Sequence, residues 1–230
     1  MKSSFATQML KTAAGKNLSS LLNRFGVFSG NNPANGLQKG WEIITQPIRD
    51  YQAYPTAGFR SLAFFQNQSG AAGTTLENQN MPGAGSFPRG QMFVVEGMEV
   101  DFKPSGLPSV KSAPGVALQL NELYAVTRAG YLTMTIGTRP YLNVGPLSQF
   151  PPSFRVFSAG ARSDTTTAAG AQAVYDQTPI NQGEPFMFIP FVLEEVVNFS
   201  VALNYDTPVT VTSAGTIGVN MNGALIRRNQ

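Results

Sequence analysis

The sequence contains neither histidine nor cysteine among its 230 residues. Those two side chains supply most of the general bases, activated nucleophiles and transition-metal ligands that act near neutral pH. Their absence excludes Ser-His and Cys-His catalysis, the usual zinc sites and a disulfide framework. Glycine, proline, phenylalanine and uncharged polar residues are abundant instead. This composition is typical of a protein that builds surfaces.

Charged residues and long apolar runs are scarce as well. Charged residues make up 13% of the chain, against about a quarter in an ordinary globular domain, and depletion of charge is a property of interface cores. The longest apolar stretch, Pro185 to Leu193, is far shorter than the roughly 18 residues of a membrane span and contains Pro190. It therefore predicts a buried strand. We expect no secretory signal, because the N-terminus lacks a continuous apolar region.

The basic residues are distributed unevenly. Residues 1–41 hold five of the 16 basic residues and no acidic residue, whereas the remaining chain holds all 13 acidic residues. The five basic residues are Lys2, Lys11, Lys16, Arg24 and Lys39. A basic arm on a near-neutral body suits contact with a polyanion, either nucleic acid or an anionic membrane face. The second interpretation is a helix with a solvated basic face that packs on a protein neighbour.

An amphipathic helix is predicted over Ser4–Phe25. Its apolar residues recur mostly at spacings of three to five, which gives one packing face. That face comprises Phe5, Met9, Leu18, Leu21, Leu22 and Phe25. Gly26 stands where a glycine in the left-handed conformation would end the helix. With the Gly/Asn/Pro linker that follows, residues 1–40 are expected to form an arm and residues 41–230 one β-sandwich domain.

After Trp41 the hydrophobic period changes to two, which indicates strands. Tyr131 to Ile136 alternate cleanly, and the other candidates share this pattern or are short apolar runs: Phe59–Gln66, Met98–Lys103, Val116–Thr127, Phe154–Ser158, Pro185–Glu194, Phe199–Asn204 and Ile217–Met221. Turn residues separate them, including Asn222-Gly223. The fold predicted is all-β: an eight-stranded antiparallel sandwich, a single jelly roll, with an N-terminal amphipathic helical arm.

Two connections of more than twenty residues, Asn67–Arg89 and Gly160–Gly183, are predicted to be loops. Loops of this length within a compact domain usually mediate binding. Their small, mostly uncharged side chains suit packing against other subunits. The alternative is that they are exposed.

Carboxylates are the remaining candidates for catalysis, because a pair of them can hydrolyse glycosides. Those on or near predicted strands are Glu96, Glu99, Asp101, Glu122, Glu194 and Glu195. Glu99 and Asp101 share a strand face with Lys103, which is typical of a solvent-facing side. No phosphate-binding loop and no closely spaced calcium loop occurs. We therefore expect no enzyme, no cofactor and no small-molecule substrate, and leave open a Ca²⁺ between subunits.

The chain resembles the jelly-roll virion proteins of bacteriophages in a diffuse pattern of strand and turn segments. The segments are Asn80-Met-Pro82, Phe87–Phe93, Val95–Val100, Leu132–Gly137, Arg139–Leu142, Gly145–Leu147, Phe150–Pro152 and Gly218–Ile226. The resemblance implies a capsid subunit, made in the host cytoplasm, that forms trimers or pentamers and tiles a shell. It also implies an N-terminal arm beneath the shell that contacts a neighbour, the genome or an internal membrane.

The rival interpretation is an oligomeric receptor- or carbohydrate-binding sandwich, such as a fibre head. That function would place exposed aromatic side chains such as Tyr51, Tyr54 or Tyr175 at a sugar site. A single roll is expected in either case, since two complete rolls usually need a longer chain.

Overall fold

The computed structural model describes residues 22–23, 26–27, 30, 37–71, 75–104, 122, 125–151, 160–164, 172–176, 185–212 and 214–228. Within these ranges the elements are β1 (Trp41–Thr45), β2 (Ile48–Tyr54), β3 (Ser61–Phe64), β4 (Gln91–Pro104), β5 (Tyr131–Ile136), β6 (Arg139–Pro146), the 3₁₀ helix η3 (Leu147–Gln149), β7 (Gly160–Asp164), β8 (Gln172–Asp176), β9 (Phe186–Leu193), β10 (Phe199–Asn204) and β11 (Gly215–Arg228).

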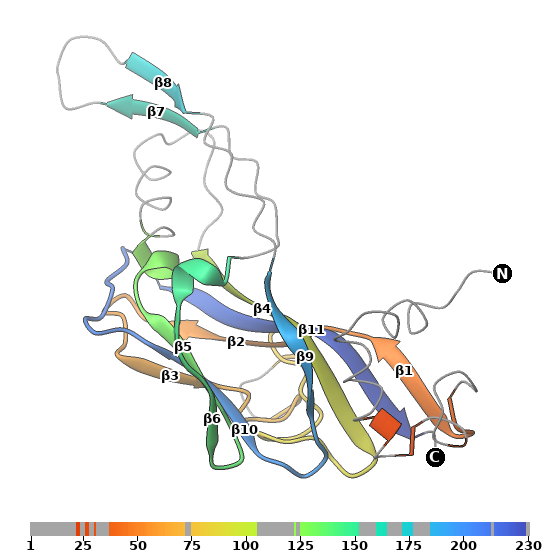
Figure 1. Ribbon diagram of the computed structural model, residues 1–230. Coiled ribbons are helices and arrows are strands. Elements are labelled where there is room, and N and C mark those ends of the chain that lie inside the picture. Colours follow the sequence, from red (N-terminus) through yellow and green to blue (C-terminus); the bar gives the residue numbers. More distant parts are fainter. Residues whose placement is uncertain are drawn as a thin grey trace.

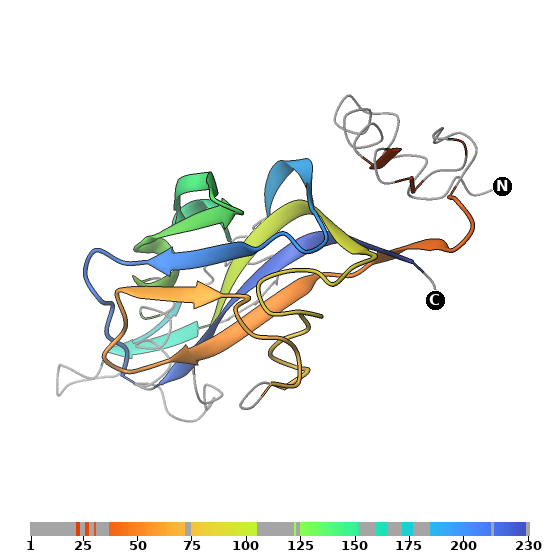
Figure 2. The same cartoon turned by 90° about the horizontal axis from the view of Figure 1, so that it is seen from below.

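Two antiparallel sheets face each other, so the predicted all-β sandwich is confirmed (Figures 1 and 2). The long sheet has the order β1-β11-β4-β9, and β2 pairs with the N-terminal part of β11. The short sheet has the order β3-β10-β5-β6. Strands β7 and β8 pair only with each other.

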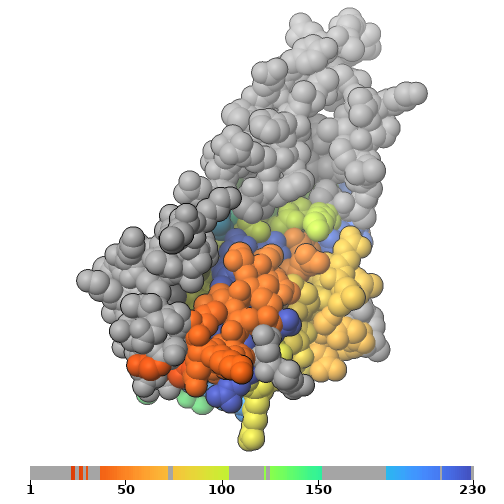
Figure 3. Space-filling view, turned by 90° about the vertical axis from the view of Figure 1, so that its right-hand side faces the viewer, coloured from red at the N-terminus to blue at the C-terminus, as the bar shows by residue number. Residues whose placement is uncertain are grey.

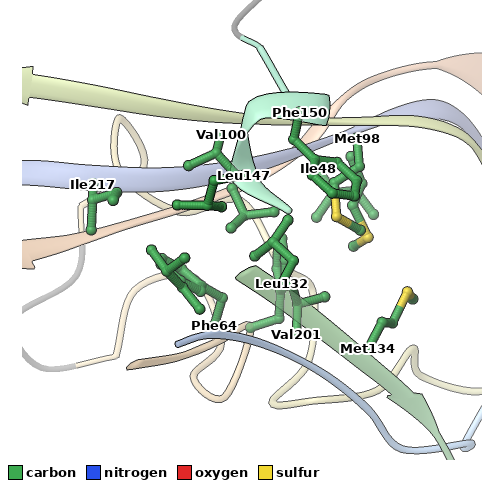
Figure 4. Close-up of a cluster of buried hydrophobic side chains, with 14 of the residues drawn as sticks. Ile48, Phe64, Met98, Val100, Leu132, Met134, Leu147, Phe150, Val201 and Ile217 are labelled. Carbon is green, nitrogen blue, oxygen red and sulfur yellow. The ribbon is translucent and has the colours of Figure 1, made fainter. Parts of the chain in front are cut away.

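The main core lies between the sheets and follows from the period-two patterns. On β10, Phe199, Val201 and Leu203 are buried and alternate with partly exposed residues. Leu132 and Met134 of β5 lie beside them in the register of the short sheet. Figure 4 shows Leu132 and Val201 of the short sheet on one side of this core and side chains of the long sheet, such as Val100, on the other. Full burial of one such side chain contributes about 1.5–3 kcal/mol to folding.

The pairing of the long sheet is irregular at one level, which we call the transverse break. β1 ends and β2 begins on either side of Gln46-Pro47. In β11 the register shifts between Asn222 and Gly223, and Glu96 is the extra residue of β4 at that point. The pairing of β4 with β9 is irregular at the same residue. The break divides the sheet into two halves.

Several predicted elements differ from the structure. The Asn222-Gly223 turn is wrong, because β11 continues through these residues with a bulge. The Val116–Thr127 strand is wrong where it is described, since Ala125–Arg128 are helical. The Gly160–Gly183 loop contains β7 and β8, and β1, β2 and β6 were not expected. The predicted eight strands are too few even among the described residues. Phe154–Ser158 lies outside them.

Candidate functional site

A second hydrophobic cluster lies on the outer face of the long sheet, on the β1 side of the transverse break. The sheet contributes five side chains, which we call the arm seat: Trp41, Met92, Val94, Val192 and Ile226. Leu22 and Val27, from the predicted arm, pack on this seat and are 3% and 0% exposed. Because strand side chains alternate between faces, Met92 and Val94 point outward while Phe93 faces the main core. The C-terminal end of the predicted helix is therefore attached to the body.

Gly26, where the sequence predicts the end of a helix, has the backbone conformation of a helix-ending glycine. Leu22 and Asn23 are helical, and Gly26 has a φ of 66°. The Val27 N–H donates to the Leu22 carbonyl at 3.3 Å, and the Gly26 N–H donates to the Asn23 carbonyl at 3.0 Å. These are the two bonds of a Schellman motif, whose usual apolar contact is supplied here by Leu22 and Val27. The Gln38 N–H also donates to the Val27 carbonyl at 2.8 Å, which fixes the segment to the start of β1.

Two basic residues lie near Trp41 of the arm seat, one before it in the sequence and one beside it in the sheet. Lys39, a predicted arm contact, is exposed in the turn before Trp41. The Arg228 guanidinium lies 4.9 Å from the centre of the Trp41 ring, a geometry in which the cation is attracted to the aromatic face. Arg227 forms an ion pair with Glu42, and alternation along β1 and β11 places this pair on the opposite face of the sheet from Trp41 and Ile226. Sequence analysis missed Trp41 and Arg228, because their pairing depends on the register of β1 with β11.

The remaining predicted arm residues cannot be placed. Leu22 is the one member of the predicted packing face within the described ranges, and it is buried. The residues outside them are Lys2, Phe5, Met9, Lys11, Lys16, Leu18, Leu21, Arg24 and Phe25.

On the β2 side of the transverse break the outer face carries a polar cluster. The Tyr51 hydroxyl donates to Asp101 Oδ2 at 3.1 Å. The Asn220 side-chain amide donates to the Tyr51 hydroxyl at 3.1 Å and to Glu99 Oε1 at 3.0 Å. Burial raises the pKa of the Asp101 carboxyl and raises the pKa of Tyr51 to about 12. Glu99 is only 8% exposed, so the expected solvent-facing position is wrong for this residue.

The two described tyrosines named for a sugar site have different surroundings. Tyr54 is fully buried. The Tyr51 ring packs closely over Gly218, where an added Cβ would lie 2.3 Å from the ring. Lys103 Nζ lies 4.0 Å from the centre of the same ring. The side chain of Tyr175 is outside the described set.

Within the described ranges, no group of three or more carboxylates is placed to hold a metal ion. Nor does any described helix have both the length and the apolar character needed to cross a bilayer. Neither a protein-family model nor a curated protein sequence matches the chain. The arm seat, with Arg228 beside Trp41, is the candidate functional feature that we consider below.

Proposed function

We propose that the sandwich is a single jelly roll. Support comes from a nested pairing of eight strands: β2 with β11, β3 with β10, β4 with β9 and β5 with β6. Along the chain the pairs are nested, so that strands from the first half of the domain pair with strands from the second half in reverse order. A long hairpin rolled into two facing sheets produces this order. Strand β1 extends the long sheet beside the C-terminal half of β11.

On this basis the protein is a non-enzymatic virion structural protein, a capsid subunit that assembles with copies of itself into a shell. The nested strand order is the observation that carries the proposal, since it matches the fold expected from the resemblance to bacteriophage jelly-roll proteins. The low charge content and the attachment of the arm to the sheet suit the same role. The site of action would be the virion, after synthesis in the host cytoplasm.

In this proposal the arm seat fixes the point at which the basic segment joins the sheet. Leu22 and Val27 attach the segment to the outer face of the long sheet. The chain before them carries Lys2, Lys11 and Lys16 without an acidic residue. A tethered cationic segment of this kind is attracted to polyanions or to an anionic neighbour. Its contact would be the genome, an internal membrane or another subunit.

Two truncations test the role of the arm. Deleting residues 1–21 removes most of the basic segment but leaves Leu22 and Val27 to fill the arm seat. We expect this variant to fold and to form fewer or smaller particles than the full chain under negative stain. A variant with Lys2, Lys11 and Lys16 replaced by Gln is the matched control, because it keeps the segment and removes charge. Full particle yield from the truncated chain would contradict the proposed role of the arm.

A carbohydrate-binding sandwich is the rival function, and it has a separate test. Tyr51→Ala would abolish binding on a glycan array if the outer polar cluster held a sugar. We expect no specific glycan signal from the unmodified protein, because the Tyr51 ring lies between Gly218 and Lys103. A signal that disappears in Tyr51→Ala would favour the rival.

A further inference from the structure

Two buried polar side chains meet where β2 is covered by the connection between β3 and β4. Part of this connection runs along the edge of β2 that does not face β11, as Figure 3 shows with β2 in orange and the connection in yellow. Asp50 of β2 and Gln79 of the connection are 3% and 1% exposed. Polar groups buried this completely are costly unless they are hydrogen-bonded, so their partners indicate what they do.

Backbone hydrogen bonds place these two residues opposite each other in an antiparallel bridge. The bonds join their neighbours in the chain: the Tyr51 N–H donates to the Asn78 carbonyl at 2.8 Å, and the Asn80 N–H donates to the Arg49 carbonyl at 3.3 Å. A pair flanked in this way is a non-hydrogen-bonded pair, in which the Cα atoms lie about 4.5 Å apart. Both side chains point to the same face, within reach of each other.

Both side chains also hold the chain as it leaves β3. Asp50 Oδ2 accepts the Phe65 N–H and, at 3.3 Å, the side-chain amide of Gln52. Gln79 Nε2 donates to the Asn67 carbonyl at 2.7 Å. Phe65 is fully buried with a φ of 64°, a conformation that a residue other than glycine keeps only with support from its surroundings. We call the pair of Asp50 and Gln79 the clasp.

The clasp has an acceptor without a donor. Gln79 Oε1 is buried and has no hydrogen-bond partner among the described residues. The Asn67 carbonyl can only accept, so it fixes Nε2 on its own side of the amide and leaves Oε1 on the other. Both bonds that Asp50 accepts use Oδ2. A proton on Oδ1 would therefore provide an O–H donor beside the unpaired amide oxygen.

The surroundings of Asp50 favour a protonated carboxyl. The described groups that face it are uncharged and come from β2, the chain after β3, the connection and β11: Gln52, Phe65, Gln79 and Val219. The nearest charged residues on the two bridged segments lie elsewhere, because Arg49 donates to the Leu76 carbonyl at 3.1 Å and Glu77 is exposed. Burial in this setting raises the pKa of Asp50 above the ordinary value of an aspartate.

We propose that the clasp is a pH-dependent fastening of the β3–β4 connection to the edge of β2. As the pH falls, Asp50 Oδ1 takes a proton from water and donates it in a hydrogen bond to Gln79 Oε1, while Oδ2 continues to accept the Phe65 N–H. The carboxyl and the amide are then bonded directly, so the connection is held more firmly in acid than at neutral pH. The clasp lies within one chain, so it is independent of the proposed capsid function.

Asp50→Asn reproduces the protonated clasp at every pH, because the asparagine amide can donate to Gln79 Oε1 while its oxygen accepts the Phe65 N–H. Hydrogen–deuterium exchange of the Phe65 and Tyr51 amides, corrected for the intrinsic effect of pH, measures how often the clasp opens. The amides of β10 report global unfolding and are the control. Between about pH 8 and pH 5 we expect protection to rise several-fold in the unmodified protein and to stay high in Asp50→Asn. Protection no higher in Asp50→Asn than in the unmodified protein at about pH 8 would overturn the proposal.

Two substitutions of matched length should change the proton affinity of Asp50 in opposite directions. Gln79→Met removes the acceptor of the proton, whereas Gln52→Met removes a donor to the carboxylate. With the carboxyl carbon of Asp50 followed by NMR against pH, we expect proton binding to weaken about tenfold in Gln79→Met and to strengthen in Gln52→Met. An unchanged or higher proton affinity in Gln79→Met would overturn the proposal. The exchange measurement on Asp50→Asn decides the matter if Gln79→Met does not fold.

Discussion

Gly223 is the residue at which β11 crosses the transverse break. A Cβ added to Gly223 would lie 1.8 Å from the Val94 carbonyl oxygen, a distance at which the backbone must move. Glycine is used where two backbones approach this closely. Asn222-Gly223 is also the residue pair that is most typical of a two-residue hairpin turn. Only the pairing of Gly223 with Val95 of β4 distinguishes a bulge from a turn, and the sequence of β11 alone does not contain that information.

Gly223→Ala is therefore expected to destabilise the fold by about 3 kcal/mol, at the upper end of the cost of overpacking. Gly70→Ala is the control: its added Cβ would have no atom within 4 Å, although its φ is 82°. That positive φ should cost the control only about 1 kcal/mol. Urea denaturation measures both changes. Equal losses of stability would contradict the close approach at Gly223.

The buried carboxyls predict how stability depends on pH. Burial raises the pKa values of Asp50, Glu96 and Asp101 in the folded protein. The folded state then binds protons more tightly than the unfolded chain, so these groups increase the free energy of unfolding as the pH falls from neutral toward about 4. Their contribution is lost again as the pH rises through the raised pKa values.

Glu96→Gln tests this dependence at a single position. Glu96 Oε1 is buried at the transverse break and has no hydrogen-bond partner among the described residues. The neutral amide should raise stability at about pH 7 by about 1 kcal/mol, because a charge no longer loses its hydration. It should also reduce the increase in the free energy of unfolding that urea denaturation measures between about pH 7 and pH 5. If Glu96→Gln is less stable than the unmodified protein at neutral pH, another group must stabilise the Glu96 carboxylate in the folded state.

Among the elements, alternation predicted the strands that have one buried and one polar face. β5 and β10 are of this kind. β6 escaped prediction because it is an edge strand, mostly exposed, with Pro140 near its start and Pro146 at its end. The apolar run of β9 was correctly predicted as a strand. The predicted burial of this strand is wrong for Met187 and Ile189, which are 59% and 75% exposed, because β9 is an edge strand and its position depends on which strands become neighbours.

The end of the arm is an element whose contribution can be measured. Leu22→Ala should cost about 2 kcal/mol, the lower part of the range for a buried leucine, because Leu22 is 3% exposed against the arm seat. The main core between the sheets is a separate cluster, so the sandwich should remain folded. Thermal unfolding followed by circular dichroism measures the loss, with Leu37→Ala as a control at an exposed position. An unchanged melting temperature would show that the arm is not held by Leu22.

For the whole molecule, the sequence predicted the class of fold, and Gly26 has the positive φ expected of a glycine that ends a helix. It did not predict where the arm attaches, because the arm seat combines side chains from β1, β4, β9 and β11. Such a surface exists only after distant strands have paired. In the folded molecule Leu22 and Val27 pack on one face of the long sheet, and the connection after β3 closes the edge at β2 (Figure 3).

Mass photometry with negative-stain imaging of the purified full chain, from low to high salt, tests self-assembly most directly. We predict a dominant trimer or pentamer, rings or closed particles, whose yield changes with salt because the basic segment contributes an electrostatic contact. Nucleic acid that copurifies at low salt and is released at high salt would identify the partner of the arm. A monomer under every condition would contradict the capsid function.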